Sequence, residues 1–299
     1  MRAITPSALL LAVFLAASAA PGPLMAQNLP KTPPSHVVLV IMENHAASQI
    51  IGSADAPYIN GLASTGAHFT QSFAVTHPSQ PNYLALFSGS THQITDNRCP
   101  LTIRAENLGQ QLTDAGKTFI GYSEGLPSAG FAGCTAPTGY ARKHAPWVNF
   151  PDLPASTHQP MTAFPTEHFS LLPTVAIVVP NLQNDMHDGS VAEGDAWLKA
   201  HLDSYVRWSK ANNALLIVTW DEDDSTQGNR IATILVGPMV KPGRYDRRIT
   251  HYDVLRTLES LFNLPFAGEA ASAQAITDVW QIEQPVGLDI SVRHGAEKR

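Results

Sequence analysis

Acidic and amide side chains directly follow two apolar segments of this chain. Glu43 and Asn44 come after the apolar run 36–42, and Asp221 and Glu222 open a row of four acids after a later run. Oxygen ligands of this kind suit a hard divalent cation, whereas a plain turn or a solvated loop would use the same residue types. Adjacent carboxylates repel one another, and a bound cation would offset that repulsion. The two positions together predict a metal site.

Two further ligand types lie in a loop after another apolar run, at 174–179. Asp185 and His187 are two residues apart there, and both types bind metals, although a loop that caps the next helix would look the same. His251 stands alone before a helical pattern, where a surface or capping histidine is the ordinary interpretation. On residue type alone, Asp185 and His187 are the stronger candidates.

Ser79 lies just before Pro81, and Pro81 suits the first turn of a helix over Pro81–Ser88. Serine at this place is either an ordinary N-cap or a nucleophile. The free N–H groups and positive dipole of a helix N-terminus attract an anion such as phosphate. A cation that lowered the hydroxyl pKa would let Ser79 attack a phosphate, and Asn82 would donate a hydrogen bond to a phosphoryl oxygen. The residues alone leave both alternatives open.

A short basic run, Arg142, Lys143 and His144, lies farther along the chain. Two cations and a histidine would suit the outer face of a bound phosphate. Taken alone, the run favours an ordinary basic surface. The chemistry of this chain therefore depends on whether the fold brings these separate motifs together.

Short β-branched apolar runs alternate with helical patterns over most of the chain, which predicts an α/β fold with a mostly parallel central sheet and helices on both faces. In such sheets ligands bind beyond the carboxyl ends of the strands, where the acidic motifs stand. The predicted strands are 36–42, 118–122, 174–179, 214–220 and 231–236. The predicted helices are 81–88, 106–115, 191–211 and 252–262.

The N-terminus predicts export. Arg2 precedes an apolar run from Ala8 to Ala20 with small residues after it, which is typical of a signal peptide over 1–26. A membrane anchor is the alternative, but the run is shorter than the roughly 20 residues that a span needs. A Pro-rich linker at 27–35 and one α/β domain at 36–299 follow, with a segment at 126–173 that we expect to cap the sheet. We expect a secreted or periplasmic protein with no stable membrane span.

Composition excludes some functions, and the cysteine count predicts a cross-link. The chain has 299 residues, 44% hydrophobic residues and a formal net charge of −6, which suits a large core and argues against general nucleic-acid binding. Cys99 and Cys134 are the only cysteines, and two cysteines in an exported protein usually pair. Neither has the neighbouring cysteine or spaced histidine of a zinc finger. The sequence therefore predicts a Cys99–Cys134 disulfide.

The motifs, in this order, resemble the secreted bacterial and fungal acid phosphatases of the phosphoesterase family. That family also contains phospholipases C and belongs to the alkaline phosphatase superfamily. The resemblance runs from Val37 to Leu264. The motifs that carry it are Glu43-Asn44, Pro78-Ser79-Gln80-Pro81-Asn82-Tyr83, Arg142-Lys143-His144, Asn184-Asp185-Met186-His187-Asp188-Gly189, Trp220-Asp221-Glu222-Asp223 and His251-Tyr252.

The resemblance implies metal-assisted phosphoryl transfer through a phosphoserine on Ser79. It places Glu43, Asn44, Asp221 and Glu222 around one metal. It also implies that Asp185, His187 and His251 bind either a second metal or the phosphate. Lys143 and His144 would contact the phosphate. The proton for the leaving group would come from His144, His187 or His251.

Departures from the zinc relatives bear on the metal and on the substrate. Relatives with two zinc ions have an Asp after the first strand and an Asp-His pair later, where this chain has Glu43-Asn44 and Asp221-Glu222. Harder oxygen ligands shift the expected ion from zinc toward calcium, magnesium or manganese, and the identity stays open. Tyr83 stands where the sulfatase motif has an arginine, which argues against a sulfatase.

The sequence thus predicts an exported metal-dependent phosphomonoesterase that hydrolyses small phosphate esters. A phosphodiesterase, in particular a phospholipase C, is the first alternative. The family's phospholipases C carry extra C-terminal domains, whereas this sequence stops soon after the helical pattern at 252–262, which favours the phosphatase branch. The second alternative is an exported protein that binds a metal or an anion and catalyses nothing, but such a protein needs no nucleophile at a helix N-terminus.

Overall fold

A computed structural model describes residues 28–281. The predicted signal peptide therefore lies outside the described residues. From the predicted linker, Ser35 N–H donates to the carbonyl of Asn213, and the Asn213 amide donates to the carbonyl of Pro33. Across the described residues, no helix has the length and apolar character that a membrane crossing requires.

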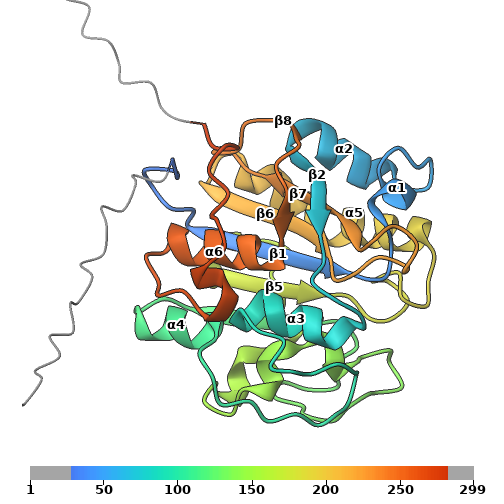
Figure 1. The fold of residues 1–299 in the computed structure, drawn as a ribbon, viewed down its shortest axis with the longest axis vertical. Helices are drawn as coiled ribbons and strands as arrows, with labels where there is room; N and C mark the ends of the chain where they lie inside the picture. Colours follow the sequence, from blue (N-terminus) through green and yellow to red (C-terminus); the bar gives the residue numbers. More distant parts are fainter. Residues whose placement is uncertain (1–27, 282–299) are drawn as a thin grey trace, which may run out of the picture.

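A nine-stranded sheet forms the centre of the described residues (Figure 1). Its order is β4-β3-β5-β1-β6-β7-β2-β8, with β9 paired to β2. Only β7 runs antiparallel to its neighbours, so the predicted mostly parallel sheet is confirmed. The strands are β1 (His36–Met42), β2 (Ala67–Phe73), β3 (Phe119–Ser123), β4 (His158–Pro160), β5 (Val175–Val179), β6 (Ala214–Trp220), β7 (Arg230–Val236), β8 (Gly243–Tyr245) and β9 (Ile249–Thr250).

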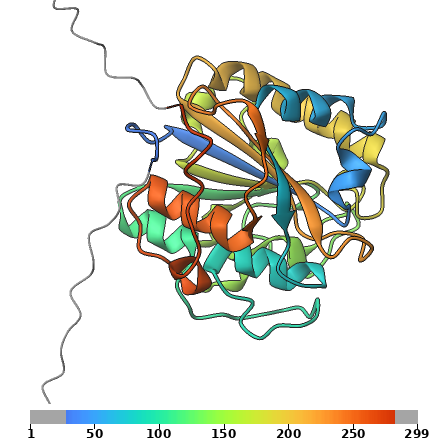
Figure 2. The same ribbon diagram turned by 45° about the horizontal axis from the view of Figure 1, so that its top comes forward.

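Helices cover both faces of this sheet, as predicted for an α/β fold (Figure 2). One face carries α1, α2 and α5, and the opposite face carries α3, α4 and α6. The helices are α1 (Ala47–Ile50), α2 (Pro57–Thr65), α3 (Ser79–Ser88), α4 (Leu108–Asp114), α5 (Val191–Ser209) and α6 (His251–Leu261).

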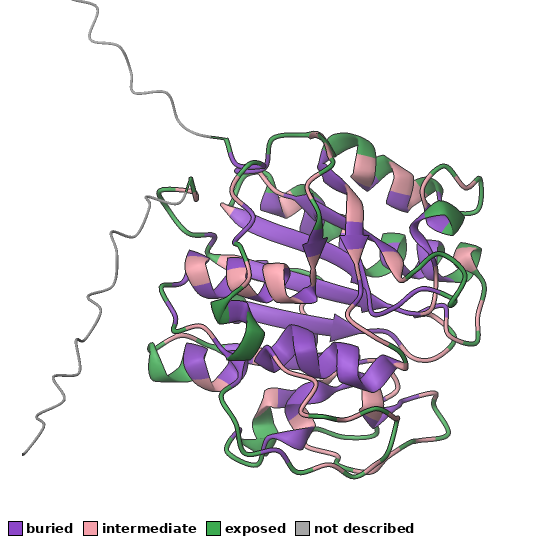
Figure 3. Cartoon of the chain, viewed as in Figure 1, coloured by how far each residue is buried: buried purple, intermediate pink, exposed green. Residues whose placement is uncertain are grey.

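The central strands β1, β5 and β6 are almost entirely apolar because each contributes side chains to the packing on both faces of the sheet. Successive side chains of a strand point to opposite faces, so Leu39 and Ile41 of β1 join the core under α3 and α6. Val38 and Val40 join the core under α2 and α5. Figure 3 shows the central strands buried and exposure concentrated on the outer helix surfaces and loops. This double burial explains why the sequence lacks polar–apolar alternation in β1, β5 and β6.

The structure differs from the sequence expectation in several elements, including the short α1, β8 and β9, which were not predicted. The run at 231–236 forms β7, which runs antiparallel because the nine residues 221–229 between β6 and β7 are too few for a parallel crossover. Strand β2 and helix α2 were not predicted either. The polar residues of β2, AHFTQSF, interrupt its apolar pattern, and α2, PYINGLAST, is too short to show a clear helical period. Most of 126–173 is irregular, with short 3₁₀ turns, but it also supplies β4 at the sheet edge.

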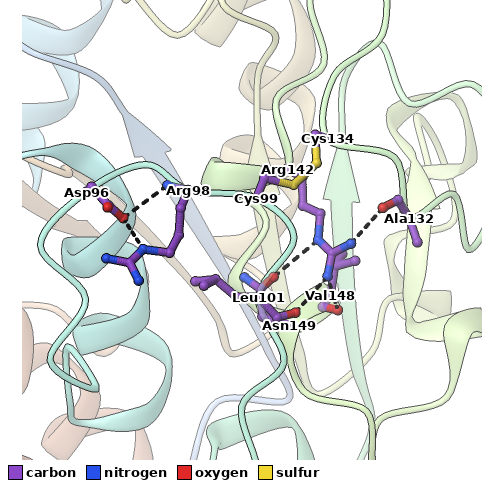
Figure 4. Close-up of a disulfide and its surroundings, with 9 residues drawn as sticks. All are labelled: Asp96, Arg98, Cys99, Leu101, Ala132, Cys134, Arg142, Val148 and Asn149. Carbon is purple, nitrogen blue, oxygen red and sulfur yellow. Dashed lines mark hydrogen bonds and ion pairs between the residues drawn. A yellow bond between two sulfur atoms is a disulfide. The ribbon is translucent and has the colours of Figure 1, made fainter.

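The predicted disulfide is confirmed: Cys99 and Cys134 are bonded, and they join the loop before α4 to the irregular segment after β3. This cross-link lies on the α3 side of the sheet, beside the 3₁₀ turn Arg142–His144 (Figure 4). It therefore lies next to one of the predicted site motifs.

Candidate functional site

The predicted site residues lie together at the carboxyl ends of the central strands. Strands β5, β1 and β6 are adjacent and parallel, so their carboxyl ends lie side by side. Glu43 follows β1, Asp185 follows β5 and Asp221 follows β6. The backbone ties these loops together: Glu43 N–H donates to the carbonyl of Asp185, and Asp221 N–H donates to the carbonyl of Met42. The parallel pairing of these strands thus brings together acidic residues that are up to 178 positions apart in the sequence.

Ser79 occupies the first position of α3 and is 2% exposed. Pro78 is the residue that precedes the helix, and no side chain caps it. The Ser79 hydroxyl instead faces two carboxylates, at 3.1 Å from Oε2 of Glu43 and 3.4 Å from Oε1 of Glu222. Of the two alternatives that the sequence left open, the geometry disfavours the N-cap, because the hydroxyl points into the acidic cluster.

Glu43, His144 and Asp185 form a compact group whose ligand atoms all lie within 4.8 Å of one another. His144 stands between the two acids, with Nε2 2.8 Å from Oε1 of Glu43 and Nδ1 3.2 Å from Oδ2 of Asp185. The Tyr83 hydroxyl donates to Oε1 of Glu43 at 2.8 Å, and its ring stacks on His144 with centroids 5.0 Å apart. All four side chains are buried.

Charge pairing overrides the effect of burial on the pKa of Glu43 and of His144, but not on that of Asp185. Burial alone would raise the pKa of Glu43, but the neighbouring His144, Lys143 and Tyr83 bring it down to about 2. Burial would lower the pKa of His144, but Glu43 and Asp185 raise it to about 9. For Asp185, burial outweighs His144 and raises the pKa. The group therefore holds an ionised Glu43 beside a protonated His144 when no metal is bound.

Asp221 and Glu222 form the second half of the cluster. Oδ1 of Asp221 accepts from the backbone N–H groups of Asn44, at 3.1 Å, and Glu222, at 2.6 Å. Burial, with Glu43 and Glu222 nearby, raises the pKa of Asp221 well above its ordinary value. Burial raises the pKa of Glu222 to about 7, against the opposing effect of His77. Two acids that hold their protons near neutrality indicate a crowded negative site.

A divalent cation fits this donor set. Oδ2 of Asp221, Oδ2 of Asp185 and Nε2 of His144 are buried without a hydrogen-bond partner of acceptable geometry, although the last two lie close to other charged groups. Buried polar atoms are rarely left unpaired. A cation would satisfy these atoms and offset the repulsion among the acids. The carboxylate-rich set suits calcium, magnesium or manganese, and its histidine also suits zinc.

Lys143 and His187 lie at the outer side of the cluster. The Lys143 ammonium donates to Nε2 of His187 at 3.0 Å, so Nδ1 of that ring donates to Oδ1 of Asp188 at 2.6 Å. The His187 backbone N–H donates to Oδ1 of Asp185 at 2.8 Å. The His187 side chain is 28% exposed, whereas His144 is 2% exposed. Lys143 and His187 are thus placed to meet an anion that enters from solvent.

Two predicted residues have partners that the sequence did not indicate. Oδ1 of Asn82 accepts from the backbone N–H groups of Val75 and Thr76, and its amide donates to the carbonyl of Thr76 and to Glu222. Asn82 thus orders the loop before Ser79, and a direct phosphate contact remains a prediction. Nε2 of His251 lies 2.7 Å from the carbonyl oxygen of Asp221, and burial lowers its pKa to about 4.

Sequence reasoning did not single out His77, although it lies only two residues before Ser79. Its Nδ1 is 2.8 Å from Oε2 of Glu222, and its Nε2 is 3.2 Å from Oδ1 of Asp223. Tyr83 was considered only as the end of a family motif and as a departure from the sulfatase motif, and not as a partner of Glu43. The helical spacing of Ser79 and Tyr83, four residues apart on one face, was the available signal for Tyr83.

The model of the Phosphoesterase family matches residues 52–265, which is most of the chain. A phosphatidylinositol-3-phosphatase of Mycobacterium tuberculosis is 52% identical over 248 residues, covering 82% of this chain and 83% of that protein. This chain belongs to the phosphoesterase family. The membership confirms the predicted family and the predicted class of enzyme, a hydrolase of phosphoric esters.

More distant relatives agree with this assignment. The phosphoesterase is 30% identical over 226 residues to an acid phosphatase of Aspergillus fumigatus, covering 69% of this chain and 51% of that protein. The chain thus spans about half the length of that fungal relative. A Vibrio parahaemolyticus protein in the alkaline phosphatase superfamily has a TM-score of 0.54 at 15% identity, covering 79% of this chain and 68% of that chain. That likeness confirms the predicted fold alone.

Proposed function

We propose that this phosphoesterase is an exported, metal-dependent phosphomonoesterase of the acid phosphatase type that acts through a phosphoserine on Ser79. The observation that carries the proposal is the buried Ser79 hydroxyl, held between Glu43 and Glu222 at the start of α3. A protein that only binds a metal or an anion needs no such hydroxyl. The relatives named as phosphatases support a monoester as the substrate.

The two carboxylates beside Ser79 have different protonation behaviour, and this difference suggests different roles. Glu43, with a pKa of about 2, stays ionised and serves as a ligand. Glu222, with a pKa of about 7, suits a group that takes up the hydroxyl proton as Oγ attacks phosphorus. The bond from Ser79 Oγ to phosphorus forms while the ester P–O bond breaks and the alcohol leaves. Water then attacks the phosphoserine, and Ser79 recovers its proton.

Glu43, His144 and Asp185 would hold a divalent cation, with Asn44, Asp221 and Glu222 close by. When bound, the cation would supply positive charge that lowers the hydroxyl pKa and neutralises the phosphoryl oxygens. His144 would lose its proton on binding, because only a neutral imidazole is a ligand. The proposal leaves the ion open among calcium, magnesium, manganese and zinc.

Lys143 and His187 are assigned to the substrate side. The Lys143 ammonium would leave Nε2 of His187 to bind a phosphoryl oxygen, and His187, protonated on that Nε2, would pass the proton to the departing alcohol oxygen while Asp188 accepts from Nδ1 and orients the ring. His251 is the weaker candidate for this proton because it is 1% exposed and its Nε2 is taken by a backbone carbonyl. The α3 N-terminus adds positive potential behind the phosphoryl group.

The proposed substrates are small phosphate monoesters, including the monoester on an inositol phospholipid headgroup, since a close relative bears that name. Export is supported by the disulfide, which forms and persists in oxidising compartments. The N-terminal leader pattern supports it as well.

The test is hydrolysis of p-nitrophenyl phosphate by the purified mature protein, before and after EDTA, with the four metals added back singly. Ser79→Ala should abolish turnover while the fold and metal binding stay intact. Activity that EDTA removes and one metal restores would support the proposal and identify the ion. Wild-type kcat in Ser79→Ala would refute the nucleophile. Activity only on the p-nitrophenyl ester of phosphorylcholine would refute the monoesterase and favour the diesterase.

A further inference from the structure

The 3₁₀ turn Arg142–His144 sends its three side chains in three directions. A 3₁₀ turn has about three residues per turn, so successive side chains are rotated by roughly 120°. Lys143 reaches His187 and His144 reaches Glu43 and Asp185, as described above. Arg142 points away from both and is 7% exposed. The basic run therefore combines two site residues with one residue that faces the protein interior.

The Arg142 guanidinium is satisfied by four acceptors (Figure 4). Nε donates to Oδ1 of Asn149 at 3.1 Å, and Nη1 donates to the carbonyl of Ala132 at 2.6 Å. Nη2 donates to the carbonyls of Leu101, at 3.0 Å, and Val148, at 3.2 Å. The acceptors come from three separate segments of the chain. Charge-assisted hydrogen bonds of this kind are about twice as strong as neutral ones.

The Cys99–Cys134 disulfide joins two of these three segments. Leu101 lies two residues after Cys99, and Ala132 lies two residues before Cys134, so each bonded cysteine is close to one acceptor carbonyl. The turn is tied to the same place through its backbone, since Arg142 N–H donates to the carbonyl of Cys134 at 2.9 Å. The cross-link and the guanidinium therefore hold the same pair of segments against the same turn.

We propose that Arg142 is a positioning residue for the reaction, and that together with the Cys99–Cys134 disulfide it holds Lys143 and His144 in place. The proposal rests on the proposed roles of those two side chains. The turn is only three residues long, so its own backbone hydrogen bonds do little to fix its orientation. Arg142, which contacts neither the substrate nor the metal in this proposal, fixes the orientation of Lys143 and His144 through its contacts with the protein interior.

Lysine cannot replace this arginine. An ammonium is a compact charge on a flexible stem, whereas the planar guanidinium presents five donors in a rigid fork. Arg142→Lys keeps the charge but loses the simultaneous contacts to Asn149, Ala132 and Leu101. Misplacing a reacting group by ~1 Å costs on the order of 10²-fold in rate. The turn should then shift, and both site residues with it.

The experiment compares Arg142→Lys, Cys99→Ala/Cys134→Ala and the combined triple variant in the oxidised, metal-loaded full protein. The readouts are kcat, KM and the calorimetric affinity for inorganic phosphate, each corrected for the folded fraction measured by near-UV circular dichroism. Arg256→Lys is the matched control, because Arg256 also donates to two backbone carbonyls, those of Ala270 and Ala271, away from the turn.

We expect Arg142→Lys to lower kcat/KM by about 10- to 100-fold and to weaken phosphate binding. Arg256→Lys should leave both unchanged. The disulfide variant, and wild type reduced with a phosphine, should change in the same direction as Arg142→Lys. Because Arg142 and the disulfide act on the same turn, their effects on kcat/KM in the triple variant should be less than additive.

Wild-type kcat/KM and phosphate affinity per folded molecule in Arg142→Lys would overturn the inference, since Arg142 would then serve the fold alone. Additive effects in the triple variant would overturn the shared role of the disulfide. Lys143→Ala and His144→Ala separate this failure from that of the proposed function. If they lose activity and Arg142→Lys does not, the positioning role is wrong; if they keep wild-type activity, the proposed function is wrong.

Discussion

Glu259, on α6, offers a stability prediction that can be worked through from its surroundings. The side chain is fully buried. Its Oε1 accepts from the backbone N–H of Ala267 at 2.8 Å, but Oε2 has no hydrogen-bond partner. Burial raises the pKa of this carboxyl to about 7, although Ala267, Gln111 and Arg256 oppose the shift. The substitution Glu259→Gln keeps the acceptor for Ala267 and removes the charge.

The sign follows from proton binding in the two states. Between pH 4.5 and about 7 the folded carboxyl keeps a proton that the unfolded chain has released. The free energy of unfolding therefore falls as pH rises through this window. At ~1.4 kcal/mol per pKa unit, the rise from 4.5 to about 7 corresponds to about 3 kcal/mol. Glu259→Gln should match wild type near pH 4 and exceed it by up to about 3 kcal/mol at pH 8.

The assay is urea unfolding of wild type and Glu259→Gln from pH 4 to pH 8, followed by tryptophan fluorescence. Glu167→Gln is the control, because Glu167 is exposed, and its effect should stay within about 0.5 kcal/mol. Taking the difference at each pH removes contributions of the acidic site that both proteins share. A difference that is constant from pH 4 to pH 8 would refute the reasoning, since the buried carboxyl would then titrate as it does in the unfolded chain.

Two further predictions concern buried or site-lining histidines. Burial lowers the pKa of His158 from 6.5 to about 4, so the contribution of this side chain to the free energy of unfolding should fall by up to about 3 kcal/mol as pH drops through that range. Urea unfolding of His158→Gln should lack this contribution, and a difference from wild type that stays constant with pH would contradict it. His77 contacts both Glu222 and Asp223, and the amide of His77→Gln can keep only one of these two contacts, so kcat should fall about tenfold with little change in KM. Steady-state kinetics with p-nitrophenyl phosphate tests this, and a change confined to KM would contradict it.

Glu259 and His158 act in opposite directions between pH 4.5 and 6.5. The carboxyl favours the folded state as pH falls, and the histidine disfavours it. The two substitutions should therefore change the pH dependence of the free energy of unfolding, relative to wild type, in opposite directions.

Much of the site was predictable because its residues occupy distinctive local positions. Glu43 and Asp221 follow strands whose continuous apolar runs indicate burial on both faces of the sheet. The carboxyl ends of such parallel strands lie side by side, which is where ligands bind. Ser79 was identifiable by the proline near a helix start. The disulfide needed only the count of two cysteines in a chain with a leader pattern.

Other features depend on contacts between segments that no local pattern encodes. The pairing of β7 with β2 joins strands from distant parts of the chain. Asn82 is hydrogen-bonded to backbone groups of the loop just before α3, and His251 is hydrogen-bonded to the carbonyl of Asp221 after β6, and residue type reveals neither partner. His77 matters only because β6 delivers Glu222 and Asp223 beside it.

The basic run 142–144 shows what the sequence predicts and what only the tertiary structure decides. The sequence alone determined an α/β fold, the strand ends that carry the acids, and Ser79 as one of two alternatives, because these follow from short-range periodicity and residue chemistry, and its motifs gave the resemblance to the phosphoesterase family. Only the tertiary structure decided that His144 enters the acidic cluster while Arg142 turns inward. Three neighbouring residues of similar charge look alike along the chain, and their roles diverge because the turn points each one at a different set of distant partners.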